Sequence, residues 1–113
     1  MNIAKTLKSL GVLQFKIYNN PTTESEYSDN VEVLNGFTKP SWDALTVKWT
    51  EIEPIGLAAE ARDKRNDLLA ATDWTAMADA PTQATAMTTY RQALRDITSQ
   101  SGWPTTINWP TKP

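Results

Sequence analysis

From Arg62 to Pro110 the chain carries an ordered series of Arg, Asp, Trp, Tyr and Pro residues at spaced positions. Asp is common at the first residues of helices, Pro ends helices, and Arg pairs with carboxylates. In this order such residues predict a small helical module whose polar side chains hold helix ends, and they make a poor catalytic centre. The residues of the series that we expect to have a structural role are Arg62, Arg65, Asp67, Asp73, Trp74, Asp79, Pro81, Tyr90, Arg91, Arg95, Asp96 and Trp109.

Composition narrows the classes of function. The 113 residues include no Cys and no His, which removes thiolate nucleophiles, Ser–His triads and His/Cys zinc sites. A net charge of −2 gives no electrostatic reason to bind nucleic acid or an anionic membrane. The sequence also lacks an apolar run of membrane-spanning length and a phosphate-binding Gly loop. We expect a protein that is not an enzyme, uses no cofactor and no metal, and binds another protein.

The first part of the chain predicts a small β-hairpin with short helices. Asn2 is a suitable N-cap for a helix that ends at Gly11. Residues 12–18 alternate between apolar and polar side chains, as a strand does, and residues 31–34 are short and β-branched. The polar residues 22–30 between them are expected to form a loop. An isolated hairpin is marginal in water, so this one needs a helix over one face.

A third helix is expected to begin after Ser41, which is a suitable N-cap. Pro54 should break it, because proline in a helix interior removes a hydrogen bond and clashes with the preceding turn. We place the boundary between two regions at this proline, giving residues 1–53 and residues 54–113. The apolar residues of this helix recur at helical spacing: Leu45, Trp49 and Ile52.

The second region predicts a helical hairpin. One helix should run over residues 54–71, and Thr72 or Asp73 should cap a short turn that contains Trp74 and Met77. Pro81 ends that turn, and Thr82 caps a last helix that Gly102 terminates. An amphipathic stripe marks the last helix: Met87, Tyr90, Leu94 and Ile97.

The end of the chain is rich in Trp and Pro. Trp103 and Trp109 are each followed by proline, which disfavours helix and favours an extended residue before it. We expect an extended tail that folds back on the Leu68/Leu94 side of the helical hairpin. The fold class is therefore α+β, with a small β-hairpin and short helices followed by a helical hairpin clasped by an extended Trp/Pro tail.

Three groups of polar residues have a chemical interpretation and a structural one, and we favour the structural one for each. For Glu60, Asp63 and Asp67, the chemical interpretation is a metal site, and the structural one is ion pairs with the interleaved Arg62, Lys64 and Arg65. For Asp73 the two interpretations are a general base and an N-cap. For Arg91 and Arg95 they are binding of a phosphate or of a partner's acidic patch, and pairing with Asp67, Asp73 or Asp79.

The ordered series resembles the phage tail assembly chaperone family over roughly residues 58–113. The matching pieces are Arg62 and Arg65-Asn66-Asp67-Leu68-Leu69, Thr72-Asp73-Trp74, Asp79-Ala80-Pro81, Tyr90 through Ile97, Gly102-Trp103-Pro104 and Trp109-Pro110. Family members often have an aromatic residue or Pro where this chain has Thr98 and Ser99. The family has variable N-terminal parts, and the first ten residues resemble the starts of small cyanophage proteins.

The resemblance implies a non-catalytic viral protein that binds a tail or tail-fibre protein and assists its assembly in the host cytoplasm. Two alternatives stay open: a structural tail or baseplate protein of the virion, and a small regulator that binds a host protein. Candidate contacts with the partner are the edge of the hairpin, by strand addition, and the surface around Trp42 and Trp49, with Trp103 as a further candidate in the tail.

Overall fold

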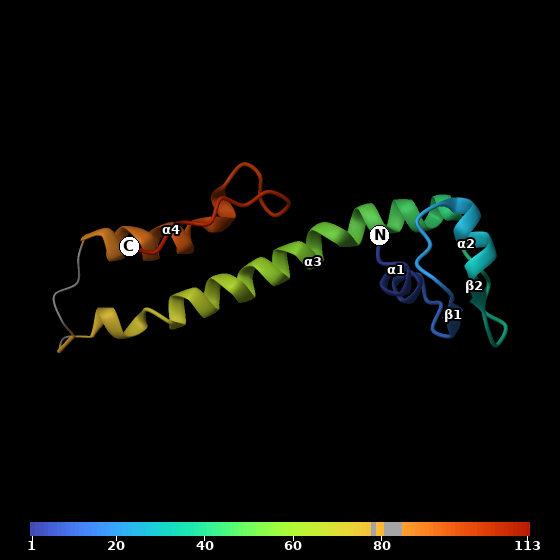
Figure 1. The fold of residues 1–113 in the computed structure, drawn as a ribbon, viewed down its shortest axis with the longest axis horizontal. Coiled ribbons are helices and arrows are strands. Elements are labelled where there is room, and N and C mark those ends of the chain that lie inside the picture. Colours follow the sequence, from blue (N-terminus) through green and yellow to red (C-terminus); the bar gives the residue numbers. More distant parts are fainter. Residues whose placement is uncertain (78, 81–84) are drawn as a thin grey trace. The chain divides into compact units, whose positions relative to one another are not determined.

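The computed structural model describes residues 1–77, 79–80 and 85–113. The chain divides into two compact units, Met1–Glu53 and Pro54–Pro113. The N-terminal unit holds a small sheet with helices, and the C-terminal unit is helical, so the fold class is α+β as predicted (Figure 1). Pro81 and Thr82, which we expected to end one turn and to cap the last helix, lie outside the described residues.

The N-terminal unit begins with helix α1 (Ile3–Ser9), whose N-cap is Asn2 as predicted. The Asn2 Oδ1 atom accepts a hydrogen bond of 2.9 Å from the backbone N–H of Lys5. Strand β1 (Phe15–Ile17) pairs antiparallel with strand β2 (Val31–Val33), with Phe15 opposite Val33 and Ile17 opposite Val31. Both predicted strands are therefore present and paired.

The segment between the strands is a helix, and our prediction of a loop over residues 22–30 was wrong. Helix α2 (Glu24–Asn30) is fixed at its start by reciprocal capping. The Thr23 hydroxyl accepts a hydrogen bond of 3.2 Å from the Glu26 N–H, and the Glu26 carboxylate accepts one of 2.6 Å from the Thr22 N–H. The arrangement is similar to a capping box, except that the carboxylate accepts from Thr22, the residue before the N-cap Thr23, and it stabilises the start of a segment of low apolar content.

One face of the β1–β2 sheet carries the core of the N-terminal unit. Its buried residues come from α1, α2, β2, the connection before β1, and the start of helix α3 (Trp42–Ala70). Helices thus cover one face of the two-stranded sheet. A sheet of two strands needs such a cover in order to be stable in water. The buried core residues are Ile3, Leu7, Val12, Tyr27, Val31 and Leu45, with Phe15, Ile17, Val33 and Trp42 packed against them.

Helix α3 runs without interruption through Pro54, so the predicted break at this residue was wrong. Its start is as predicted, because the Ser41 hydroxyl accepts a hydrogen bond of 3.1 Å from the Ala44 N–H. An interior proline costs about 3 kcal/mol, mainly through one lost hydrogen bond and one clash. Pro54 is exposed, and the remaining hydrogen bonds of this long helix on both sides of it offset that cost.

The C-terminal unit contains the second part of α3, the 3₁₀ turn η1 (Asp73–Ala76), helix α4 (Thr85–Arg95) and the 3₁₀ turn η2 (Ile97–Ser99). The predicted stripe forms the core of the unit, since Tyr90, Leu94 and Ile97 are buried and Met87 is half-buried. Gly102 does not end the last helix as predicted, because α4 stops at Arg95 and η2 follows.

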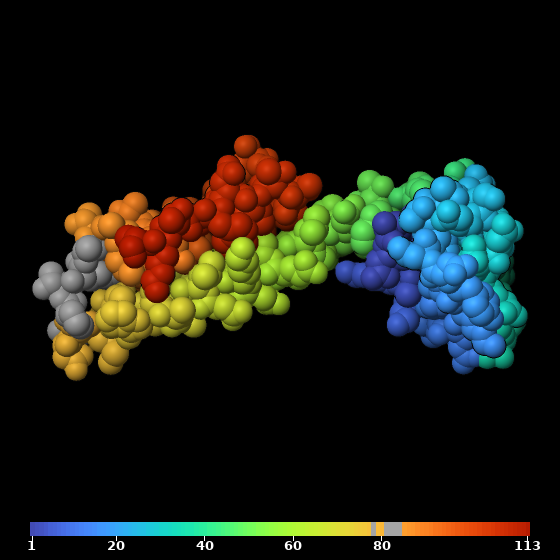
Figure 2. All heavy atoms as spheres, viewed as in Figure 1, coloured from blue at the N-terminus to red at the C-terminus, as the bar shows by residue number. Residues whose placement is uncertain are grey.

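The tail is only partly extended. Residues 101–106 form turns, in which the Thr106 N–H donates a hydrogen bond of 2.7 Å to the Gly102 carbonyl and the Trp103–Pro104 bond is cis. The residues after Thr106 have no regular structure and run back along α4 (Figure 1). Figure 2 shows this last segment, in red, lying over the helices of the C-terminal unit. The prediction of a tail extended throughout was thus wrong for Trp103 to Thr106.

Candidate binding surfaces

Arg91 joins three elements of the C-terminal unit. Its Nη1 atom donates hydrogen bonds of 2.8 Å to the Leu69 carbonyl and 2.7 Å to the Thr72 hydroxyl. Its Nη2 atom lies 2.7 Å from Oδ1 of Asp73. The guanidinium of Arg91 in α4 therefore binds one carbonyl near the end of α3 and the first residue of η1. The predicted pairing of Arg91 with an acid is confirmed, and its hydrogen bonds give Arg91 a structural role.

Asp73 does not act as an N-cap, and that prediction was wrong. The N-cap of η1 is Thr72, without a side-chain cap hydrogen bond, and the Asp73 carboxylate turns to Arg91. The Thr72 hydroxyl donates to the Leu68 or Leu69 carbonyl, both 3.2 Å away. The next residue, Trp74, is 54% exposed, so this motif tryptophan presents more than half of its surface to solvent.

The charged residues of α3 between Glu60 and Asp67 form no ion pair within the part of the chain that the structure describes, so the predicted pairs were wrong. Arg65 instead donates two hydrogen bonds to the Asn66 side chain. Arg62 and Lys64 lie over tryptophan rings of the tail, 5.5 Å from the centroid of Trp103 and 4.2 Å from that of Trp109. Cation–π contacts have replaced the expected ion pairs.

The tail is held by these contacts and by Gln100. The Gln100 side chain donates to the Asn108 carbonyl and accepts from the Asn108 N–H, both at 2.8 Å. Trp109 and Ile107 also line a shallow groove of about 370 Å³ with Leu57 and Ala61 of α3. The tail contacts on α3 therefore fall on residues 57–64, on the face of the helix that also carries Leu68.

The other motif residues have varied surroundings. Asp79 lies in a turn, and Asp67 and Arg95 are exposed. Asp96 accepts a hydrogen bond of 3.1 Å from the Gln92 side chain. Among the described residues, Arg95 makes no ion pair, so the two arginines of α4 do not act together. Of the series, Arg91 makes the most hydrogen bonds.

In the N-terminal unit, Trp42 contributes to the core. It is half-buried, and its ring centroid lies 5.7 Å from that of Tyr27. The Tyr27 hydroxyl donates a hydrogen bond of 2.6 Å to the Pro40 carbonyl, and burial raises the pKa of this phenol. Hydrogen bonds from Thr22 lower the pKa of Glu26 below its ordinary value.

Trp49 lines a groove of about 530 Å³ on the same unit. The other lining residues are Met1, Asn2, Ile3, Ala4, Ile17, Asn20 and Pro21. Of the two tryptophans that we predicted as partner contacts on α3, Trp42 packs on core residues and Trp49 borders an open groove.

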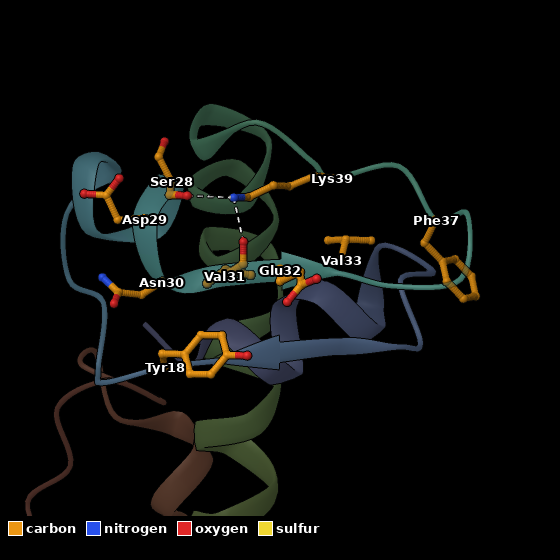
Figure 3. Close-up of a pocket in the computed structure, with 9 residues that line it drawn as sticks. All are labelled: Tyr18, Ser28, Asp29, Asn30, Val31, Glu32, Val33, Phe37 and Lys39. Carbon is orange, nitrogen blue, oxygen red and sulfur yellow. Dashed lines mark hydrogen bonds between the residues drawn. The ribbon is translucent and has the colours of Figure 1, made fainter.

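Lys39 is a residue that sequence reasoning missed. Its Nζ atom donates to the Val31 carbonyl at 2.7 Å and to the Tyr27 and Ser28 carbonyls at 3.3 Å (Figure 3). It also lies 4.6 Å from the centroid of the Tyr27 ring. The lysine thus caps the end of α2 and covers the start of β2. A lone lysine in a loop carries no local signal of this role.

Among residues 1–77, 79–80 and 85–113, no group of three or more His, Cys, Asp or Glu side chains is placed to hold a metal ion. Within the same ranges, no helix combines the length and the apolar character needed to cross a membrane.

Comparison with known proteins gives one match. Residues 58–113 match the sequence profile of the phage tail assembly chaperone protein family. Searches of curated proteins and of solved structures found no significant similarity to the chain. The matched segment contains the Arg91 hydrogen bonds, the η1 turn and the tail with its two tryptophans. Residues 58–113 of this chain therefore belong to the phage tail assembly chaperone family.

Proposed function

We propose that this chain is a non-catalytic chaperone that binds a phage tail protein, such as a tail-fibre component, and assists its assembly. The match of residues 58–113 to the family carries this proposal. The geometry of the module supports it, because Arg91 and Asp73 are engaged in holding the hairpin together and present no free pair for acid–base chemistry. The chain acts in the host cytoplasm, before the particle is complete.

A binding role also suits the surfaces of the two units. The C-terminal unit exposes Trp74 and Met77 around η1, at 54% and 62%, and the N-terminal unit has the open groove beside Trp49. Exposed aromatic and apolar side chains of this kind are typical anchors in protein interfaces.

The experiment is capture of the tail proteins of the same phage by the tagged chain. Each tail and tail-fibre protein is expressed alone and with the chain, and soluble yield and co-purification are measured. We expect one of them to co-purify and to gain soluble yield only with the chain. An unrelated aggregation-prone protein is the control, and its yield should not change.

A phage that lacks the gene completes the test. We expect heads without finished tails or fibres by electron microscopy, restored by the gene in trans. If tails form normally and no tail protein co-purifies, the proposal is wrong. If the chain is found in purified particles at fixed stoichiometry, it is a structural part of the virion. Co-purification with a host protein alone would instead indicate a regulator.

A further inference from the structure

The two outer edges of the β1–β2 sheet differ in how their backbone groups are satisfied. The Tyr18 N–H donates to the Asn30 carbonyl and the Leu34 N–H to the Gln14 carbonyl, at 2.8 and 2.9 Å. Each bond joins two residues that lie opposite each other when the register is extended by one residue at either end. Because hydrogen-bonded and non-hydrogen-bonded pairs alternate in an antiparallel ladder, Ile17–Val31 is a non-hydrogen-bonded pair. The backbone groups of both residues point outward, toward the sheet edges.

On the β2 edge the outward groups of Val31 already have partners. The Val31 N–H donates to the Tyr27 carbonyl, and the Val31 carbonyl accepts from Lys39. A strand that paired with β2 would have to displace Lys39 from three carbonyl oxygens, which Figure 3 shows in part. Lysine at a strand edge is a known protection against pairing with other chains.

On the β1 edge the corresponding groups belong to Phe15 and Ile17. Within the described residues, no hydrogen bond joins the outward N–H or C=O group of either residue to another part of the chain. Two donors and two acceptors thus stand in the alternating order that an extended polypeptide matches. Among the described residues, the β1 edge is thus open at both Phe15 and Ile17, whereas the β2 edge is closed at Val31 and open only at Val33.

A groove lies on the β1 side of the sheet. The groove of about 530 Å³ is lined by Ile17, by Ile3 and Pro21, and by Trp49 of α3, and no residue of β2 lines it. This volume is in the range of sites that hold a ligand group among apolar walls. A strand added to β1 would place a side chain where it can enter the groove and meet Trp49.

The charge of this side favours an acidic partner. Residues 1–23 contain Lys5, Lys8 and Lys16 and no Asp or Glu, and all three lysines are exposed. The acids of the unit begin at Glu24 and follow on α2, β2 and α3, and of these Glu32 lies opposite Lys16 in the register. On α3 near Trp49, Glu51 pairs with Lys48 at 3.1 Å, and Glu53 is exposed. Opposite charges at an interface speed association and select among partners.

We propose that the outer edge of β1 binds an extended acidic segment of the tail protein as a third strand, with one apolar side chain of that segment in the Trp49 groove. This inference rests on the proposed function and names the surface and the chemistry of the partner. A third strand would also stabilise a sheet that is marginal with two. The surface lies outside the matched residues 58–113 and would let the N-terminal unit select the client.

The first test uses the full chain and the tail protein that it captures. Trp49→Ala should weaken binding about tenfold, as loss of a central aromatic anchor does. Lys16→Glu should weaken binding several-fold and lower its salt dependence. The matched control is Phe37→Ala, which removes an exposed aromatic ring from the β2 side, where it lines a different pocket. It should leave affinity unchanged, and thermal melts check that each variant is folded.

The second test is hydrogen exchange of the unmodified chain with and without that tail protein. The amides of Phe15 and Ile17 should exchange at least tenfold more slowly in the complex, since they become strand hydrogen bonds. Binding that slows neither amide, or that is unchanged by both Trp49→Ala and Lys16→Glu, overturns the β1 inference while the chaperone function stands. Slowing without the tail protein, in a dimer of the chain, also overturns it. Capture of no tail protein removes both proposals.

Discussion

Arg91 of α4 and Asp73 of η1 form an ion pair with Nη2 and Oδ1 2.7 Å apart, but the two side chains differ in environment. The Arg91 side chain is 9% exposed, whereas that of Asp73 is 66% exposed. Arg91 also binds the Leu69 carbonyl and the Thr72 hydroxyl, while among the described residues the Asp73 side chain bonds only to Arg91. The pair is therefore asymmetric: the arginine holds the hairpin, and the aspartate is an exposed partner.

This asymmetry predicts unequal effects of substitution. Arg91→Ala removes the hydrogen bonds that the guanidinium donates to the Leu69 carbonyl and to the buried Thr72 hydroxyl, so it should lower the free energy of unfolding by about 1–3 kcal/mol. Asp73→Ala should cost no more than about 0.5 kcal/mol, because water screens an exposed carboxylate. Chemical denaturation of the two variants measures both values. Equal losses would show that the pair itself, and not the buried hydrogen bonds, stabilises the turn.

The start of α2 predicts a pH dependence. Hydrogen bonds from Thr22 lower the pKa of Glu26 from its ordinary value of 4.5, so the folded state favours the ionised carboxylate. A lowered folded pKa stabilises the fold above the unfolded pKa, and this contribution disappears as the pH falls through the lowered value. Glu26→Gln should therefore melt below the unmodified chain at pH 7, and the difference should shrink toward pH 3.

Glu24→Gln is the matched control for this series. It removes the same charge from the same helix end but no hydrogen bond to Thr22. The pH dependence of its melting difference should be the smaller of the two. A constant difference for Glu26→Gln across this range would contradict the capping role of its carboxylate.

Much of this fold follows from local patterns. Asn2 and Ser41 are found at the helix starts where their side chains predict them, and the stripe that includes Tyr90 and Leu94 is buried. Predictions from local sequence were wrong where several small energetic contributions oppose one another. The helix continues through Pro54, since a long helix tolerates one interior proline. Helix α2 depends on reciprocal capping by Thr23 and Glu26, which we did not recognise in this polar segment.

The contacts between distant residues were harder to predict. The pairing of Arg91 with an acid followed from the excess of matching residues in the module, but three acids were equivalent in sequence. Lys64 has Glu60 and Asp67 one helical turn away and Arg62 has Asp63 beside it, and only the course of the tail brings tryptophan rings to these cations instead. Lys39 lies in a loop, and its three carbonyl acceptors are brought together by α2 and β2.

Gly102 predicts a steric effect in the turn that begins the tail. A Cβ atom at this position would overlap the backbone oxygen of Thr106. Backbone atoms in a hydrogen-bonded turn move less readily than a flexible side chain, so Gly102→Ala should lower the free energy of unfolding by about 1–3 kcal/mol. The control is Ser101→Ala, an exposed neighbour in the same turn region. Chemical denaturation measures the free energy of unfolding of both variants. If Gly102→Ala is as stable as Ser101→Ala, the turn adjusts to the added Cβ atom without cost.

The tail predicts a stabilising role for its tryptophans. Trp109 is half-buried, lies over Lys64 and lines the groove with Leu57 and Ala61, so burial of its ring should stabilise the C-terminal unit by a few kcal/mol. Lys64→Ala should cost only about 0.5–1 kcal/mol, the size of an exposed cation–π contact. Deletion of residues 103–113 should lower the melting temperature of the unit or cause aggregation.

Deletion of residues 111–113 alone is the matched control, since these three residues are exposed. The shorter deletion should melt like the full chain, because it leaves the Gln100–Asn108 hydrogen bonds and both rings in place. Differential scanning calorimetry compares the three proteins. If the chain without residues 103–113 melts unchanged but no longer captures the tail protein, the tail is a binding arm for the client, and the contacts of Trp103 and Trp109 with α3 contribute little to folding.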